Sequence, residues 1–168
     1  MAALIEVLEQ LIELHQALLQ LGKDKTPVLV KNEVDKLSSI VQKEKSLVKK
    51  VEELDRKRVQ LIGEYLISRG YNPDPRIRIS DLVKVVFKAE EKKALIDVQA
   101  RLLESIRELQ KQNEMNQKLV EQSLAFINYT LDLFVKTPEQ DAFYQRPQAQ
   151  QPQHAYNTVR SGLFDTKA

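Results

Sequence analysis

The sequence contains no cysteine among its 168 residues. A disulfide scaffold, a thiolate metal site and a cysteine nucleophile are therefore excluded, and the absence weakly favours a reducing compartment. Aromatic residues make up only 6% of the chain and glycine only 4 residues, whereas Leu, Glu, Lys and Gln are abundant. This composition is typical of long helices and coiled coils rather than of sheets.

Long apolar runs are missing as well. The richest one, residues 124–135, includes Asn128, Thr130 and Asp132, and it falls short of the roughly 20 apolar residues that cross a bilayer. The first ten residues, MAALIEVLEQ, carry acidic side chains but no basic segment, which argues against a secretory signal. We therefore expect a cytoplasmic protein that does not insert into a membrane.

Charge of one sign is not concentrated anywhere in the chain. The formal net charge is +2, and the Lys-rich stretches at 43–58 and 76–93 are interleaved with acidic residues. Such mixing favours solvated helix faces over a nucleic-acid patch. Nucleic acid is therefore not an expected partner.

What the sequence does have is apolar residues at spacings of three and four, which predict three main helices. The first covers residues 3–21, with Gly22 as its C-terminal cap and the following KDKTP segment as an interruption. The second begins at Asn32, a good N-cap, and runs to about Ser68. Its apolar seam comprises Leu37, Ile40, Val41, Leu47, Val48, Val51, Leu54, Leu61, Ile62 and Tyr65.

The segment RGYNPDPRIR ends the second helix, because Gly70 can cap it and two prolines cannot continue it. Ser80 and Asp81 can cap a short apolar turn, after which the third long helix covers residues 90–135. We expect the two long helices to lie antiparallel with the first helix beside them. The predicted fold is therefore all-α, an elongated antiparallel helical bundle over residues 1–136.

Residues 137–168 differ in composition, with three prolines, six glutamines and single aromatic residues without helical period. Such a segment cannot bury enough apolar area to offset the entropy lost on ordering. We predict a flexible Pro/Gln-rich tail.

No constellation for catalysis or metal binding can be found. The two histidines, His15 and His154, are preceded three residues earlier by Ile12 and Gln151, so the Glu-x-x-His pair of di-iron bundles is absent. There is no Gly-rich phosphate loop and no Ser with a nearby His. The sequence thus predicts no enzyme, no metal site and no cofactor, and it favours a protein that binds other proteins.

Residues 113–134, NEMNQKLVEQSLAFINYTLDLF, are the informative segment. Their seam is polar at Asn113, Asn116, Ser123 and Thr130, while apolar residues cover much of the remaining circumference. One helix cannot cover so broad a surface. Two interpretations stay open: the first two helices sandwich this segment, or it forms a groove for a foreign amphipathic helix.

The order of these parts resembles the FlgN family of flagellar export chaperones, in particular its Gram-positive branch. The resemblance lies in KNEVDKL at residues 31–37, in Arg58, in residues 113–134, and in the tail YNTVRSGLFDTKA at 156–168. It implies a cytosolic chaperone that binds the C-terminal helical ends of hook-associated proteins, the proteins of the hook-filament junction. The chaperone keeps them competent for the flagellar type III export apparatus.

The resemblance also implies where partners bind. The client site would be the last half of the third helix, and a tail tyrosine, Tyr156 or Tyr144, would dock on the cytoplasmic domain of the export gate. Isolated hydrophobic residues near Tyr156, among them Phe164, fit a short motif that orders on a partner. The candidate client-binding residues are Asn116, Leu119, Ser123, Phe126, Ile127, Thr130, Leu131 and Phe134.

A different class of function also fits the periodicity. The chain could be a structural coiled-coil scaffold or a homo-oligomer whose exposed seams bind copies of itself. Light scattering separates the two, because a chaperone forms a small one-to-one complex with its client.

Overall fold

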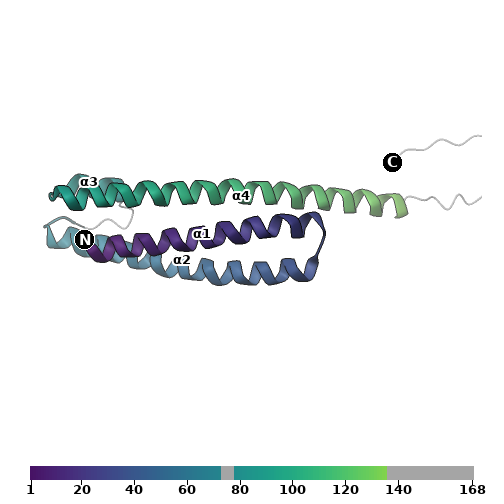
Figure 1. Cartoon of the computed structure of the whole chain (residues 1–168), viewed down its shortest axis with the longest axis horizontal. Helices are drawn as coiled ribbons and strands as arrows, with labels where there is room; N and C mark the ends of the chain where they lie inside the picture. Colours follow the sequence, from purple (N-terminus) through teal and green to yellow (C-terminus); the bar gives the residue numbers. More distant parts are fainter. Residues whose placement is uncertain (73–77, 136–168) are drawn as a thin grey trace, which may run out of the picture.

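The computed structural model describes residues 1–72 and 78–135. Within these ranges the chain forms helices and no strand: α1 (Ala2–Val30), α2 (Val34–Ser68), α3 (Ile79–Val85) and α4 (Ala89–Val135). The helices build an elongated bundle (Figure 1). The predicted all-α class and the three long helices are thus confirmed, while the predicted tail lies outside the described residues.

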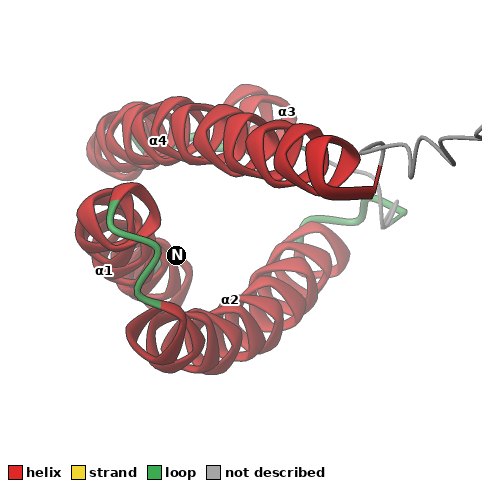
Figure 2. Cartoon of the chain, turned by 90° about the vertical axis from the view of Figure 1, so that its right-hand side faces the viewer, coloured by secondary structure: helices red, strands yellow, loops and turns green. Residues whose placement is uncertain are grey.

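The long helices alternate in direction along the bundle axis. In Figure 1, α2 returns antiparallel to α1, and α4 runs in the direction of α1. Helix α1 packs against both α2 and α4, whereas α2 and α4 share no comparable contact. Figure 2, a view along the bundle, shows α1 between the other two. The second and third long helices are antiparallel, as expected, but α1 lies between them and not beside a pair that they form.

The central position of α1 follows from its composition. It contributes nine of the buried residues, among them Val7 and Ile12, which lie about 140° apart around the helix, whereas α2 contributes only Ile62 and Leu66. A buried face this broad needs more than one neighbouring helix to cover it. The seam predicted for α2 is mostly half-exposed, because one neighbour covers only part of it.

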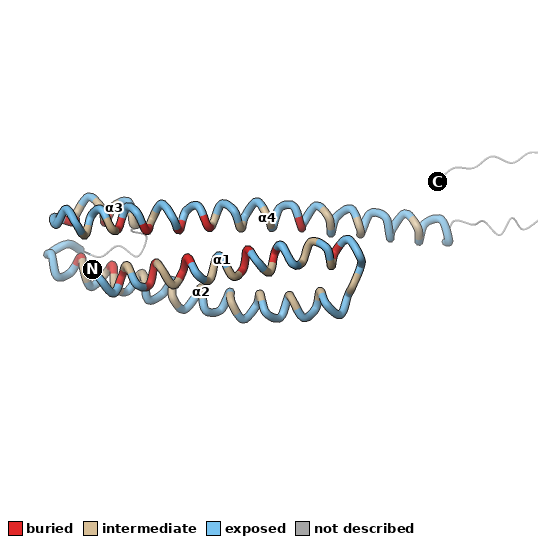
Figure 3. The backbone as a smooth tube through the Cα atoms, viewed as in Figure 1, coloured by how far each residue is buried: buried red, intermediate tan, exposed pale blue. Residues whose placement is uncertain are grey.

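The core is concentrated at the end of the bundle that holds the N-terminus and α3 (Figure 3). Its members come from all four helices, and α3 closes this end by packing on α4. The buried side chains with the least exposure are Leu8, Ile62, Leu66, Leu82, Leu95, Val7 and Val98. The bundle is therefore held firmly at one end and more loosely toward the other.

The prediction that the first helix ends before Gly22 is wrong. Helix α1 continues through Pro27 to Val30. A proline inside a helix removes one hydrogen bond and crowds the carbonyl group four residues earlier. Pro27 stands in the last turn of α1, so the lost hydrogen bond and the crowding affect only the end of the helix. Gly22 is buried against α4, so it is a packing residue and not a cap.

The turn between α1 and α2 depends on Asn32, which has a left-handed backbone with φ of 54°. The Glu33 amide donates to the Val28 carbonyl (3.1 Å) and the Asn32 amide to the Leu29 carbonyl (3.2 Å), which is a Schellman motif. Asn32 therefore ends α1 and is not the N-cap of α2, because asparagine tolerates this conformation better than most residues. The N-cap is Glu33.

The other two predicted caps can be compared directly. Gly70 closes α2 as predicted, with φ of 78° and the Tyr71 amide donating to the Leu66 carbonyl (3.0 Å). Helix α3 begins at Ile79 with Arg78 as its N-cap, so Ser80 and Asp81 lie inside the helix and do not cap it.

Candidate partner-binding surface

The last part of α4 extends past the ends of α1 and α2 (Figure 1). We call residues 117–135 the projecting end; its first residues still border the bundle, and the rest extends beyond it. No residue of α4 beyond Asn116 is buried, although the segment is rich in apolar side chains. Phe126 and Phe134, for example, are 70% and 76% exposed. A contiguous apolar surface of this kind marks an interaction site.

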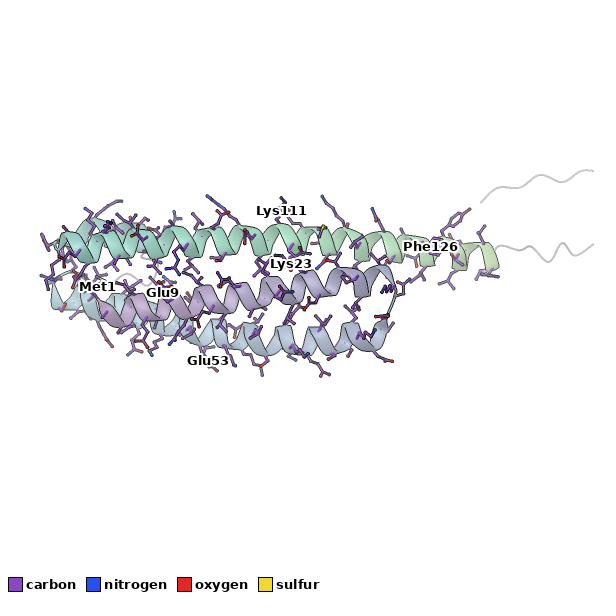
Figure 4. The ribbon with its side chains drawn as sticks, in the orientation of Figure 1. Met1, Glu9, Lys23, Glu53, Lys111 and Phe126 are labelled. Carbon is purple, nitrogen blue, oxygen red and sulfur yellow. The ribbon has the colours of Figure 1, made fainter. Side chains whose placement is uncertain are left out.

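The structure places most of the predicted client-binding residues on this surface. Phe126, Ile127, Leu131 and Phe134 are exposed, and Leu119, Ser123 and Thr130 are half-buried. Figure 4 shows Phe126 beyond the end of the α1–α2 pair. Of the two interpretations left open by the sequence, the sandwich of this segment between the first two helices is therefore wrong for the described residues.

Asn116, the remaining predicted client-binding residue, is buried in the contact with α1. Its side-chain amide donates to the Gly22 carbonyl (2.7 Å), and its Oδ1 accepts from the Thr26 hydroxyl (2.7 Å). The Thr26 hydroxyl in turn accepts from Gln112 Nε2 (2.9 Å). We call Gly22, Thr26, Gln112 and Asn116 the polar cluster. Its geometry assigns Asn116 to the α1–α4 contact in this structure, so it is not an exposed client residue.

Gly22 allows this close approach of the two helices. A Cβ atom at that position would lie 3.0 Å from Gln112 Cγ, so a larger side chain would push Gln112 away. A second link, from Arg101 to both carboxylate oxygens of Glu9 (2.6 and 2.7 Å), joins the same two helices nearer the core. Together the two links fix the register of α4 on α1.

The polar cluster yields a stability prediction. Asn116→Ala should lower the free energy of unfolding by about 1–3 kcal/mol, because buried hydrogen-bonding groups on α1 lose a partner. Asn113→Ala, an exposed change one turn away, should stay within about 0.5 kcal/mol of the parent protein. Urea unfolding followed by circular dichroism measures both. Equal effects of the two substitutions would contradict the assigned role of Asn116.

An open cavity of about 390 Å³, which we call the trough, lies where the three long helices meet. Its charged wall is an ion pair between Lys25 and Glu44 (2.6 Å), and its apolar wall includes Val48 of α2 and Leu109 of α4. Gln117 and Val120, the first residues of the projecting end, also line it. The trough is therefore continuous with the exposed apolar surface of α4.

The comparison with known families agrees with this arrangement. The sequence model of the FlgN protein family matches residues 1–152, which include the whole bundle and the projecting end. The chain belongs to the FlgN family. FlgN proteins are chaperones of flagellum biogenesis and not an enzyme family.

A relative and the solved structures were compared as well. The chain is 28% identical over 166 residues to the uncharacterized protein YvyG of Bacillus subtilis (strain 168), a match that covers 99% of this chain and 98% of that protein. Because Bacillus is Gram-positive, the predicted branch of the FlgN family is confirmed. No solved structure matches the chain.

Two exposed carboxyl groups of this FlgN-family chain have a lowered pKa, and both lie outside the projecting end. A hydrogen bond from Lys36 holds the pKa of Glu33 below its ordinary value. A hydrogen bond from Lys84 lowers the pKa of Asp81 in the same way. Water screens such surface ion pairs. We therefore expect neither carboxyl group to make binding at the projecting end depend on pH.

The described residues also bear on metal and membrane binding. They contain no group of three or more His, Cys, Asp or Glu side chains placed to hold a metal ion. His15 Nδ1 lies 2.6 Å from the Leu11 carbonyl, a contact within α1, and His154 is outside the described residues. None of the helices described is long and apolar enough to cross a membrane.

Sequence reasoning missed three members of the polar cluster, Gly22, Thr26 and Gln112. A signal was present, because a glycine inside an apolar helical repeat is often explained by close packing. The export-gate candidates, Tyr156 and Phe164, lie outside both the described residues and the range matched by the FlgN family model. Their role stays a prediction.

Proposed function

We propose that this protein binds the C-terminal helical region of hook-associated proteins in the cytoplasm and delivers them to the flagellar type III export apparatus. The observation that carries the proposal is the projecting end of α4, an exposed apolar helix in a member of a flagellar chaperone family. The proposed client surface comprises Leu119, Ser123, Phe126, Ile127, Thr130, Leu131 and Phe134. Asn116 is left out of it because its amide is bonded to α1.

The chemistry of this surface suits an amphipathic helix. Its exposed residues are apolar over several turns, as in proteins that receive the apolar face of a foreign helix in a groove. The half-buried hydroxyl of Thr130 donates to the Phe126 carbonyl (2.9 Å), so it needs no partner from the client. Binding would therefore depend on apolar burial, at roughly 25 cal/mol for each Å² removed from water.

The direct test is titration of the full chain with the C-terminal regions of the hook-associated proteins of the same bacterium. Calorimetry should give saturable binding, and light scattering should give a one-to-one complex. The absence of binding to any of these regions would refute the proposal. Self-association of the chain alone, with no effect of the added regions, would instead support the structural scaffold or homo-oligomer, for which the same exposed surface could serve.

Residues 137–168 give a separate prediction about delivery. We expect truncation after Lys136 to leave the melting temperature and the client affinity unchanged and to abolish binding to the cytoplasmic domain of the export gate. Tyr156→Ala should reproduce much of that loss, and Phe164→Ala part of it, because short motifs that order on binding depend on a few anchors. Tyr144→Ala serves as the comparison. Retained gate binding together with a higher client affinity would mean that the tail covers the client surface.

A further inference from the structure

The apolar side chains of the projecting end lie on two sides of α4. At about 100° per residue, Val120, Leu124 and Leu131 fall together on the side that lines the trough. By the same count Leu119, Phe126 and Leu133 fall together about 140° away, on the other flank of the side that faces α1. We call these the trough-side face and the far face. Leu131 and Leu133, one from each face, are 55% and 56% exposed, so both faces are accessible.

Each face continues a groove of the bundle. The trough lies on one flank of the α1–α4 contact and includes Val120. A second cavity of about 320 Å³ is lined by Leu19 and Lys23 of α1 and by Gln112 and Met115 of α4. Met115 falls on the same side of α4 as Phe126 and Leu133. The trough therefore runs onto the projecting end at Val120, and the second cavity ends at Met115, on the side of the far face.

The part of α4 that packs on α1 shows how wide an arc around a helix one neighbouring helix buries in this protein. The buried residues Leu95, Val98, Leu102, Ser105 and Asn116 span an arc of about 80° around the α4 axis. On the projecting end, the large apolar residues from Tyr129 through Phe126 and Ile127 to Val135 span about 240°. One partner helix would leave more than half of this arc in water.

The line between the two faces is formed by small polar residues. Ser123 and Thr130 continue the direction in which Ser105 and Asn116 face α1. Side chains of this size let neighbouring helices approach closely, as Gly22 and Thr26 do at the polar cluster. The polar strip of Glu114, Lys118 and Glu121 lies on the other side of the helix and would stay in solvent.

We propose that the projecting end binds two helical segments of one partner chain, one on each face. The segments and α4 would form a three-helix bundle that continues the bundle of this protein. This inference rests on the proposed function and specifies its partner as a polypeptide with two amphipathic segments joined by a connection. A single chain is favoured because the second segment then binds at a high effective concentration. A symmetric pair of two copies would add only one helix to each projecting end and leave the other face open.

The absence of cysteine allows a clean test in the full chain. Leu131→Cys marks the trough-side face, Leu133→Cys the far face, and Glu121→Cys the polar strip as the matched control. The probe is the C-terminal region of a hook-associated protein, and the readout is the rate of thiol alkylation. At a one-to-one ratio, we expect the probe to slow alkylation strongly at the cysteines of both faces. The alkylation rate of the control cysteine should stay unchanged.

Affinity gives the second readout. Leu131→Ala and Leu133→Ala should each weaken binding of the probe by about tenfold or more, as for interface anchors. Protection and affinity loss at one face only would overturn the two-segment inference and leave the proposed function intact. No effect at either face would overturn both.

Other outcomes would also overturn the inference. Two probe molecules bound to each chain would mean two separate partners. Protection without the probe that disappears on dilution would assign one face to a second copy of this chain. Protection without the probe that does not depend on concentration would assign it to residues 136–168 of the same chain.

Discussion

Phe126→Ala should weaken client binding by about 1–4 kcal/mol and leave the melting temperature nearly unchanged. The reason is that Phe126 is 70% exposed on the projecting end, so the fold loses little when the ring is removed, whereas a bound client loses an aromatic anchor. Ile127→Ala, at a side chain 49% exposed, should act in the same direction with a smaller effect. Calorimetric titration and thermal melting of the same preparations measure the two quantities.

Glu121→Ala is the matched control, because Glu121 is exposed on the polar strip of the same helix. Its client affinity should equal that of the parent protein. A large fall in melting temperature for Phe126→Ala, with normal client affinity, would assign the ring to the core and contradict the proposed surface.

Leu8→Ala should have the opposite profile, with a loss of about 2–5 kcal/mol in the free energy of unfolding. Leu8 is fully buried in α1 and belongs to the cluster that joins all four helices. Its truncation therefore leaves a cavity in the part of the bundle that holds the structure together. Urea unfolding by circular dichroism measures the loss, and client affinity should be retained at temperatures where the variant is folded.

Leu124→Ala is the control for this change, since it removes the same atoms from a side chain that is 54% exposed. Its effect on unfolding should be within about 0.5 kcal/mol. If Leu8→Ala cost no more than Leu124→Ala, α1 could not be the central helix of the bundle.

The helices themselves could be predicted from the sequence because their signals are local. Apolar residues at spacings of three and four located α2 and α4 within a few residues, and Gly70 marked the end of α2. The exposure of residues 119–134 was also predictable in part. Apolar residues around most of a helix cannot all be covered by one neighbour, so some of them had to remain accessible.

The arrangement of the helices could not be predicted in the same way. Periodicity shows which side of a helix is apolar, but it does not show which helix that side contacts. Lys25 and Pro27 look like an interruption locally, yet α1 continues because Leu29 is buried beyond them. Asn116 is a similar case. Its polar side chain suggested a site for a foreign helix, whereas its partners, Gly22 and Thr26, lie about 90 residues earlier in the chain.

The central position of α1 has a consequence for the order in which the protein folds. Only three residues separate α1 from α2, so their contacts can form soon after synthesis of the first 68 residues. The contacts between α1 and α4, such as Glu9 with Arg101, join residues 92 positions apart and must form later. Helix α4 then docks on a hairpin that is already present. The projecting end, as the last part of α4 to leave the ribosome, emerges when the helices on which the rest of α4 docks have already been synthesised.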